Sequence, residues 1–453
     1  MMDLEKLPVV VIGAGPVGLA AAAHLTERGV TFVLLEAGPG PAASVREWKH
    51  VRLFTPWRYN IDTAARRLLA PTGWQEPDGD TLPTGRQLLT DYLAPLAALP
   101  DIAASLRLDS RVEAISRVGY DRIRTPGRES APFRVRIVNR SGTTSEIAAR
   151  AVVDASGTWR TPNHLGADGL PAYGERPGVR HLVTGLPDVL GVDRDRFAGR
   201  HTIVVGAGHS ATTTLLALGE LRTSSPATAV TWAIRGPSPT RAYGDTTDEL
   251  PARGAIGARL RDLVEADAVQ LVTDFFTHRL ETSPTGIEVT GRNPDGVERH
   301  LVGDLVVNAT GFRPDHHLAA ELRLTLDSTL GCPRAIAPLI DPNEHFCGSV
   351  PAHGVDQLAH DEVGYYIAGV KSYGRAPTFL LATGYEQVRS VVAALAGDWA
   401  AARDLSRSPT APGLASICAP AQPARAAQAS PCAGPPQTPD AAETPTSARV
   451  TRA

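Results

Sequence analysis

Cysteine is scarce in this chain of 453 residues, which contains only Cys332, Cys347, Cys418 and Cys432. No two of them form a Cys-x-x-Cys pair. A secreted disulfide scaffold needs more cysteines, and a zinc ribbon or a dithiol redox centre needs such a pair, so these classes are excluded. We expect Cys347 to be a small buried hydrophobic residue, with redox use as the alternative. For Cys418 and Cys432 we favour chance occurrence over the alternatives, which are binding of soft metal ions and electron shuttling.

The sequence also lacks an excess of charge of either sign. Lys and Arg total 45 and Asp and Glu total 48, which gives a formal net charge of −3 at pH 7. A basic surplus is typical of proteins that bind nucleic acid or anionic membranes. The composition therefore gives no electrostatic reason to expect nucleic acid or a membrane as a partner.

No long uninterrupted apolar run occurs. The best candidate, residues 8–23, is broken by glycines and a proline and is shorter than the roughly 20 residues that span a bilayer. The acidic residues Asp3 and Glu5 precede it, whereas a signal peptide begins with basic residues. We expect a buried strand and turn here, and a cytoplasmic protein.

A strand, a glycine-rich turn, a helix and a second strand follow one another twice. The first copy reads PVVVIGAG, PVGLAAAAHLTERG and VTFVLLEAG, and the second reads RHTIVVGAG, HSATTTLLALGEL and AVTWAIRG. Such βαβ units predict parallel, doubly wound sheets. Because the chain is too long for one ordinary core, we predict an α/β protein with two Rossmann-like dinucleotide-binding domains.

Two further apolar runs, within residues 149–163 and 303–315, lead into Asp/Asn-Ala-Ser/Thr-Gly. We predict that they bracket a second domain that is inserted into the first. The C-terminal segment is rich in Pro, Ala, Ser and Thr and has almost no large apolar residue, so we expect it to be disordered. The predicted boundaries are 1–160 and 303–405 for the first domain, 161–302 for the second domain and 406–453 for the disordered tail.

The first glycine-rich turn has the spacing that a dinucleotide pyrophosphate requires. Gly13 can form the tight turn, Gly15 can admit the phosphates, and Gly18 can let the helix pack on the strand. Glu36 ends the next strand, where its carboxylate could accept hydrogen bonds from ribose hydroxyls. This pattern favours FAD or NAD, with a purely structural turn as the alternative. The residues of this predicted site are Gly13, Ala14, Gly15, Pro16, Gly18 and Glu36.

The second turn differs from the first in two respects. Ala211 stands in the place of the third glycine, which the pattern allows, and Arg235 stands where the first copy has an acid. A guanidinium can pair with a phosphate that a carboxylate would repel. The second turn therefore predicts the 2′-phosphate of NADPH, with an ordinary surface arginine as the alternative. The residues of this predicted site are Gly206, Gly208, His209, Ser210, Ala211 and Arg235.

The motifs GAGHSA and NATGFRPD, together with the two turns, resemble the flavin-containing and Baeyer–Villiger monooxygenases, over nearly all of the chain before the tail. The resemblance implies FAD at the first turn and NADPH at the second. It places Thr310 and Gly311 beside the nucleotides. It also places the start of a helix at Thr383 and Gly384 against the flavin pyrimidine, where negative charge grows on reduction. The implied activity is a monooxygenase that acts through a flavin C4a-peroxide on a small molecule, with molecular oxygen as co-substrate.

The sequence departs from that family at one motif. The family carries Phe-x-Gly-x-x-x-His before its second turn, but here neither Gly174 nor Gly178 has the required distance to His181. The stretches VKSYGRAPTFLLATGYEQVRS and RLFTPWRYNID are more similar to a bacterial branch found in arsenic-resistance gene clusters. Two alternatives therefore stay open: an NADPH-dependent flavin reductase that passes electrons to a small acceptor or a partner protein, and a non-catalytic nucleotide-sensing flavoprotein.

Three polar side chains are candidates for a catalytic role beside the flavin. The Asn60 amide, in VRLFTPWRYNID, could donate to a flavin peroxide, with a buried turn capped by asparagine as the alternative. Lys371 and Tyr373, in GVKSYGRAP, follow a predicted strand at the edge where doubly wound sheets place ligands, with a solvated loop as the alternative. Residues 315–317, Asp-His-His, are expected to form a turn, and no metal site is predicted.

Overall fold

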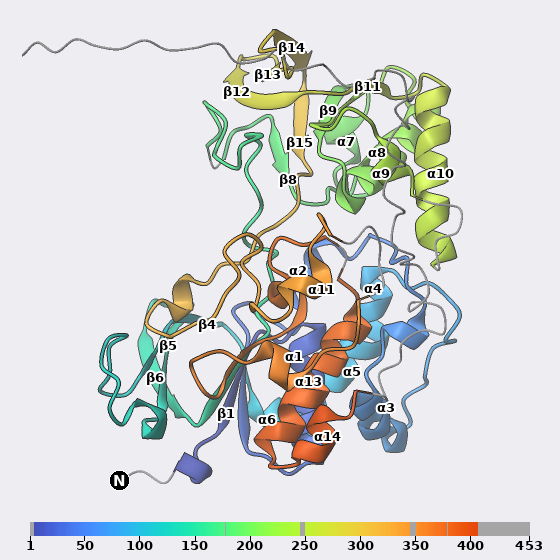
Figure 1. The fold of residues 1–453 in the computed structure, drawn as a ribbon. Coiled ribbons are helices and arrows are strands. Elements are labelled where there is room, and N and C mark those ends of the chain that lie inside the picture. The colour runs from blue at the N-terminus through green and yellow to red at the C-terminus, as the bar shows by residue number, and fades with distance from the viewer. Residues whose placement is uncertain (1–3, 177, 245–249, 345–349, 378, 406–453) are drawn as a thin grey trace, which may run out of the picture.

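The computed structural model describes residues 4–176, 178–244, 250–344, 350–377 and 379–405. The chain forms two domains, one built from the N-terminal and C-terminal parts of the described chain and one from its middle (Figure 1). The predicted disordered tail and the cysteines Cys347, Cys418 and Cys432 lie outside the described residues. No helix within the described ranges is long and apolar enough to cross a membrane.

The first domain contains a parallel sheet of five strands. All of its pairings are parallel, and β1 and β7 are entirely buried. A strand that is buried on both faces needs apolar residues along its length, which explains the run VVVI and the first three residues of AVVD. The strand order is β16 (Tyr365–Ile367), β7 (Ala151–Asp154), β1 (Val9–Ile12), β2 (Phe32–Leu35) and β3 (Leu106–Arg107).

Different layers cover the two faces of this sheet (Figure 1). Because side chains alternate along a strand, Val9 and Val11 enter the core beneath the helices, while Val10 and Ile12 enter a second core. The helical layer includes α1 (Pro16–Glu27), α3 (Thr63–Leu69), α6 (Pro100–Ser105), α13 (Leu381–Leu395) and α14 (Trp399–Arg403). The opposite layer is an antiparallel sheet of β4 (Ser110–Arg117), β5 (Phe133–Asn139) and β6 (Thr144–Ala149).

The second domain repeats this plan. Its core sheet is also parallel, and Val204 packs beneath helices while Ile203 and Val205 face an antiparallel sheet. Its strand order is β11 (Gln270–Val272), β10 (Ala229–Ala233), β9 (His201–Val205), β15 (Leu305–Asn308) and β8 (Leu182–Thr184). The covering elements are the helices α8 (His209–Ser224) and α10 (Pro251–Glu265) and the strands β12 (Phe276–Thr282), β13 (Ile287–Arg292) and β14 (Glu298–Gly303). The predicted fold class, two doubly wound domains with the second inserted in the first, is confirmed.

One predicted boundary differs from the structure. The sequence places residues 303–405 in the first domain, but β15 pairs with β9 and β8 of the second sheet. Its apolar run fills the centre of that sheet, so the chain returns to the first domain only after Asn308. The two connections between the domains then meet, because Pro162 and Phe312 form an antiparallel bridge.

The remaining elements are short. They are η1 (Leu4–Lys6), α2 (Ala43–Glu47), η2 (Trp57–Tyr59), η3 (Ala70–Thr72), α4 (Gly85–Gln87), the π-helical η4 (Leu88–Leu93), α5 (Ala94–Ala97), η5 (Arg128–Ser130), α7 (Arg194–Phe197), α9 (Thr240–Tyr243), η6 (His317–Ala319), α11 (Ala337–Ile340), α12 (Val355–Leu358) and η7 (Gly369–Tyr373).

Candidate functional site

The first glycine turn joins β1 to α1. Gly13 has φ +93°, and a Cβ atom there would lie 2.7 Å from the Ala155 carbonyl oxygen. A Cβ at Gly18 would lie 1.8 Å from the Gly13 carbonyl oxygen, so helix and turn can approach only because Gly18 has no side chain. At Gly15, the N-cap of α1, a Cβ would meet nothing within 4 Å. The outer glycines thus serve packing, while Gly15 faces open space at the helix N-terminus, which is where a phosphate binds in this motif.

Glu36 fastens this turn to the end of β2. Its carboxylate accepts hydrogen bonds from the backbone N–H of Ala14 at 3.0 Å and of Gly38 at 2.8 Å. These bonds use one acceptor site on each oxygen, and a carboxylate has about four such sites in total. The side chain therefore holds the turn and keeps acceptor capacity for a ribose hydroxyl.

The second glycine turn joins β9 to α8 in the same manner. Gly206 has φ +131°, and a Cβ there would lie 2.2 Å from the Ala309 carbonyl oxygen. Gly208 is the N-cap of α8, and its Cβ position again meets nothing within 4 Å. Ala211 is fully buried, so the methyl group in the third position is accommodated in the core of the second domain.

Arg235 follows β10 and is exposed. Its guanidinium donates to the Ala167 carbonyl oxygen at 2.8 Å, which fixes its direction with one of its five N–H groups. The arginine therefore lies at the end of the strand that follows the second turn, at the position predicted for a 2′-phosphate contact.

The segments that connect the domains cross at Thr310 and Gly311. Gly311 has φ +93°, and the backbone N–H of Asn163 donates to its carbonyl oxygen at 2.9 Å. The Asn163 amide donates to the Thr310 carbonyl oxygen at 3.0 Å, and the Asn308 amide donates to the Asn163 carbonyl oxygen at 2.8 Å. The family resemblance implies that Thr310 and Gly311 lie beside the nucleotides, but it gives no role to Asn163 or Asn308, whose partners lie about 145 residues away.

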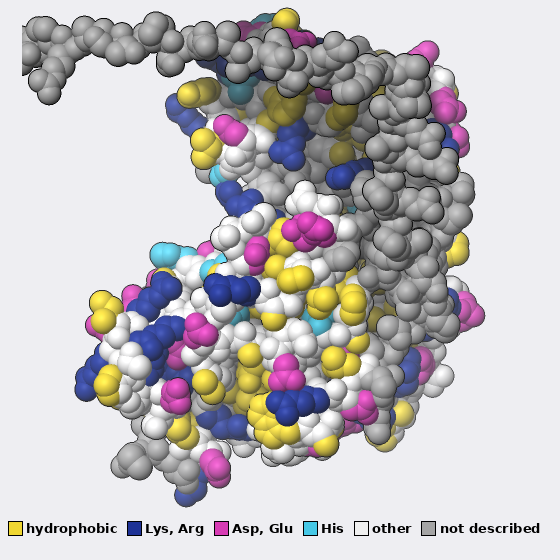
Figure 2. Space-filling view, viewed as in Figure 1, with side chains coloured by type: hydrophobic (Ala, Val, Ile, Leu, Met, Phe, Trp, Pro, Cys, Tyr) yellow, Lys and Arg dark blue, Asp and Glu magenta, His cyan; other side chains and the backbone are white. Residues whose placement is uncertain are grey.

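The two domains also touch through a pair of aromatic rings. The Phe54 ring, from the loop before η2, lies against the His209 ring at the start of α8, with ring centroids 5.0 Å apart. The molecular surface is hollowed between the two domains, and Arg side chains gather on the wall formed by the second domain (Figure 2). The loop that carries Asn60 thus reaches the second glycine turn.

Lys371 is buried in an ion pair, so the alternative of a solvated loop is wrong for this side chain. Its ammonium lies 2.7 Å from Asp154 Oδ2 and 3.2 Å from Ser156 Oγ, and both charged side chains are at most 1% exposed. Burial by itself would raise the pKa of Asp154, but the Lys371 charge and the hydrogen bonds from Ser156 outweigh it and hold this pKa below its usual range. Sequence reasoning missed Asp154, although it ends a buried apolar run.

Tyr373 and the start of α13 form one packed unit. Tyr373 is 2% exposed, and its ring packs edge-on against the Phe379 ring, with the ring centroids 5.0 Å apart. Burial raises the pKa of the Tyr373 hydroxyl, and a hydrogen bond with Thr383 opposes that rise. A Cβ at Gly384 would lie 2.6 Å from Val17 Cγ2. Gly384 therefore permits α13 to pack against the first turn of α1, and Thr383 and Tyr373 are held beside that contact.

Asn60 is not a free donor in this structure. Its amide N–H groups donate to the Thr55 carbonyl oxygen at 2.7 Å and the Pro56 carbonyl oxygen at 3.1 Å. Its Oδ1 accepts from the Thr55 hydroxyl at 2.9 Å, and the side chain is fully buried. The amide is used by its own turn, which corrects the prediction that Asn60 donates to a flavin peroxide and favours the alternative of a capped turn.

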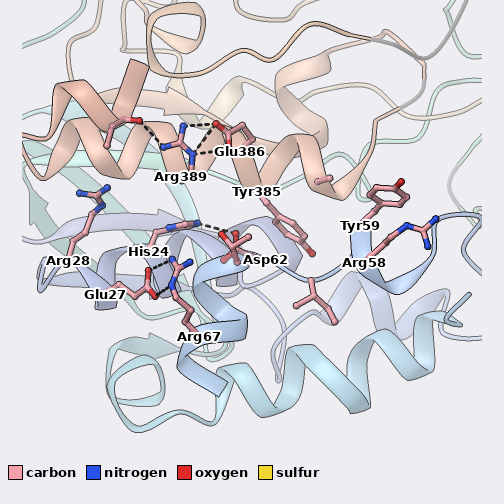
Figure 3. Close-up of a pocket in the computed structure, with 14 residues that line it drawn as sticks. His24, Glu27, Arg28, Arg58, Tyr59, Asp62, Arg67, Tyr385, Glu386 and Arg389 are labelled. Atoms are coloured by element: carbon pink, nitrogen blue, oxygen red, sulfur yellow. Dashed lines mark hydrogen bonds and ion pairs between the residues drawn. The ribbon is translucent and has the colours of Figure 1, made fainter. Parts of the chain in front are cut away.

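A cavity of about 580 Å³ opens elsewhere on the first domain (Figure 3). Its wall includes the last turn of α1, where Glu27 pairs with Arg67 at 2.7 Å and His24 pairs with Asp62 at 3.0 Å. None of the site residues predicted from the sequence lines it. The cavity thus lies at the opposite end of α1 from the glycine turn, and ion pairs line its wall.

Comparison with known proteins supports this geometry. Residues 8–76 match the family model of the FAD-dependent oxidoreductases. These residues contain the first glycine turn and Glu36, so the first domain is an FAD-binding domain. The chain is also 30% identical over 206 residues to the indole-3-pyruvate monooxygenase YUCCA6 of Arabidopsis thaliana, a match that covers 44% of this chain and 42% of that protein. The chain therefore spans about two fifths of the length of this curated relative.

Several solved structures share the fold. The bacillithiol disulfide reductase Bdr (YpdA) of Bacillus cereus has a TM-score of 0.61 at 18% identity, covering 86% of this chain and 99% of that one. The FAD-bound cadaverine monooxygenase DfoA of Erwinia amylovora has a TM-score of 0.59 at 15% identity, covering 93% and 99%. The ornithine N-hydroxylase KtzI of Kutzneria sp. 744 has a TM-score of 0.58 at 17% identity, covering 86% and 99%. This chain has the fold of flavoproteins with two dinucleotide-binding domains. The fold is shared by monooxygenases and disulfide reductases alike, so it does not choose between those activities.

Proposed function

We propose that this flavoprotein is an NADPH-using monooxygenase that acts on a small molecule with molecular oxygen. The observation that carries the proposal is the pair of open glycine positions, Gly15 and Gly208, each at the start of a helix and each in its own domain. Two separate dinucleotide sites suit an enzyme in which one bound nucleotide, NADPH, passes electrons to the other, FAD. The Phe54–His209 contact links a loop of the first domain to the second turn.

The residues of the first turn fit FAD. A Cβ at Gly15 would enter otherwise open space, and the α1 N-terminus presents backbone N–H groups there. When bound, FAD would supply the redox chemistry. The chain would hold the pyrophosphate with residues 13–18, hold the ribose with Glu36, and position the flavin through Thr383, Gly384 and Tyr373.

The second turn is proposed to bind NADPH. Residues Gly206 to Ala211 would hold its pyrophosphate at the start of α8, with Thr310 and Gly311 beside the nucleotide. Arg235 would contact the 2′-phosphate, since it lies at the end of the following strand and keeps N–H groups beyond the one that binds Ala167.

One observation favours oxygen over a dithiol as the acceptor of electrons. Cys332 is the single cysteine in the part of the chain that the structure describes, and it is fully buried. Burial raises the pKa of its thiol to about 11, so it is a thiol and not a nucleophilic thiolate near neutral pH. A buried single thiol does not suit the disulfide exchange that a reductase of this fold would perform.

Parallel measurement of NADPH and oxygen consumption tests the proposal. The purified protein is loaded with FAD and assayed with and without candidate substrates, and hydrogen peroxide is measured alongside the oxygenated product. A monooxygenase consumes oxygen and NADPH in equal amounts and forms product in place of peroxide. Faster reoxidation by a quinone or dye than by oxygen would instead establish the reductase, and binding of both nucleotides without turnover would establish a sensing flavoprotein.

A further inference from the structure

Lysine is used sparingly in this chain, and one lysine is buried. Only Lys6, Lys49 and Lys371 occur among the 45 basic residues. An ammonium carries three N–H groups, but Lys371 finds two acceptors among the described residues, Asp154 and Ser156. One N–H group of a 1% exposed ammonium therefore has no protein acceptor there.

Asp154 cannot take this remaining hydrogen. Its Oδ1 accepts from the backbone N–H and the hydroxyl of Ser156 at 3.1 and 2.6 Å. Its Oδ2 accepts from Lys371 at 2.7 Å and from the Tyr365 hydroxyl at 2.9 Å. These four bonds fill the acceptor sites of a carboxylate. All acceptor sites of Asp154 are therefore occupied, while one N–H group of Lys371 has no acceptor among the described residues. Both groups are buried, where an unsatisfied hydrogen-bond donor costs free energy.

The ammonium lies next to the first glycine turn. A Cβ at Gly13 would lie 3.0 Å from Ser156 Cα, and the Ser156 hydroxyl lies 3.2 Å from Lys371 Nζ. Asp154 ends β7, and Lys371 follows β16 by four residues. The three strands β1, β7 and β16 are neighbours in one parallel sheet. Their carboxyl ends form the edge where such sheets bind ligands.

We propose that Lys371 donates its third hydrogen bond to an oxygen of the phosphate–ribityl part of FAD, an inference that rests on the proposed function. The phosphates carry the negative charge that a buried ammonium would favour, and the ribityl hydroxyls carry acceptors next to them. Asp154 then acts as a positioning residue, because it holds the ammonium without contacting the cofactor. The ion pair is thus part of the cofactor site as well as of the core.

Affinity for FAD tests this role. Apoprotein of the double variant Lys371→Met/Asp154→Asn, which removes both charges together, is titrated with FAD by flavin fluorescence. Tyr365→Phe is the matched control, because it removes a buried hydrogen bond to the same carboxylate but leaves the ammonium. We expect the double variant to bind FAD about tenfold or more weakly, as for loss of a charge-assisted hydrogen bond. The control should stay within about twofold of the wild type, and apoprotein melting temperatures report the state of the fold. Equal affinity of wild type and a folded double variant would overturn the proposal.

A second measurement needs no destabilising change. With three lysines in the chain, selective isotope labelling gives three side-chain signals, and Lys371→Arg identifies the one from Lys371. Adding FAD to the wild-type apoprotein should shift the Lys371 ammonium signal and slow its proton exchange, while the signal of the exposed Lys6 stays in place. FAD binding without any change at Lys371 would refute the contact and leave the proposed function intact. Absence of FAD binding by the wild type would refute both.

Discussion

The ring of Phe54 rests on the ring of His209, 5.0 Å between centroids, and so joins a loop of the first domain to the first residue of the helix behind the second glycine turn. His209 stands where the proposed NADPH pyrophosphate meets that helix. Through this contact we expect the first domain to influence the proposed NADPH site.

Phe54→Ala should weaken NADPH binding and leave FAD binding intact. An aromatic pair contributes about 0.5–1.5 kcal/mol beyond its buried area, which corresponds to roughly a two- to tenfold rise in the dissociation constant for NADPH. Titration of the holoenzyme with NADPH measures it, and the flavin absorbance reports FAD content. Tyr173→Ala, which removes an exposed aromatic ring of the second domain, should change neither. A loss of FAD with unchanged NADPH binding would contradict the assignment of the two turns.

Arg235→Ala should narrow the preference for NADPH over NADH. A charge-assisted hydrogen bond to the 2′-phosphate is worth about 1.5–3 kcal/mol, so the ratio of kcat/KM values should fall by about tenfold or more. Arg279→Ala, at an exposed arginine that pairs with Glu281 on β12, is the control. An unchanged ratio in the Arg235 variant would remove this residue from the nucleotide site.

Asn60→Ala should lower the free energy of unfolding without changing the ratio of hydrogen peroxide to oxygenated product. The variant loses two donated hydrogen bonds and one accepted bond in a buried turn, at a cost of about 1–3 kcal/mol. Thr55→Val removes one of these bonds and should show part of the same loss. Chemical denaturation measures stability, and the ratio of hydrogen peroxide to product measures the chemistry. A raised peroxide ratio at unchanged stability would restore Asn60 as a donor beside the flavin.

The parts of the structure that the sequence predicted are those encoded by neighbouring residues. The runs VVVI and HTIVV, each followed by Gly-x-Gly, contain both the strand and the turn, so the two doubly wound domains could be predicted. The partners of Lys371 could not, because Asp154 lies 217 residues away and only the adjacent ends of β7 and β16 bring the two together. The Asn60 prediction failed for the opposite reason. A competing partner for its amide, the backbone of its own turn, lies four to five residues away, and local sequence does not tell a capped turn from a ligand contact.

Stability should fall as the pH drops below about 6.5, in part because of His360. Its Nδ1 accepts from the backbone N–H of Thr325 at 3.2 Å, and burial lowers its pKa to about 4. Between about pH 6.5 and pH 4, His360 is protonated in the unfolded chain but stays neutral in the folded chain. The free energy of unfolding is therefore unaffected by this histidine above about pH 6.5 and decreases as the pH falls from about 6.5 to about 4. The loss is about 3 kcal/mol or less. Melting temperatures at pH 7.5 and 5 should differ less for His360→Gln than for the wild type. His317→Gln, at an exposed histidine, should behave as the wild type does.

Replacing Gly15 or Gly18 of the first glycine turn by valine should affect FAD binding and stability differently. At Gly15 a Cβ meets nothing within 4 Å, so the Gly15→Val apoprotein should fold with a melting temperature close to that of wild-type apoprotein. Its side chain occupies the space that the phosphates need, so the protein should stay colourless when FAD is added.

At Gly18 a Cβ lies 1.8 Å from the Gly13 carbonyl oxygen, and the helix must move away from the strand, at a cost of about 1–3 kcal/mol or more. Gly18→Val should therefore lower the melting temperature of the apoprotein as well as FAD content. Melting curves and flavin absorbance, recorded for both variants with and without FAD, separate the two cases. A Gly15→Val protein that turns yellow with FAD would show that the cofactor does not approach the backbone at this turn.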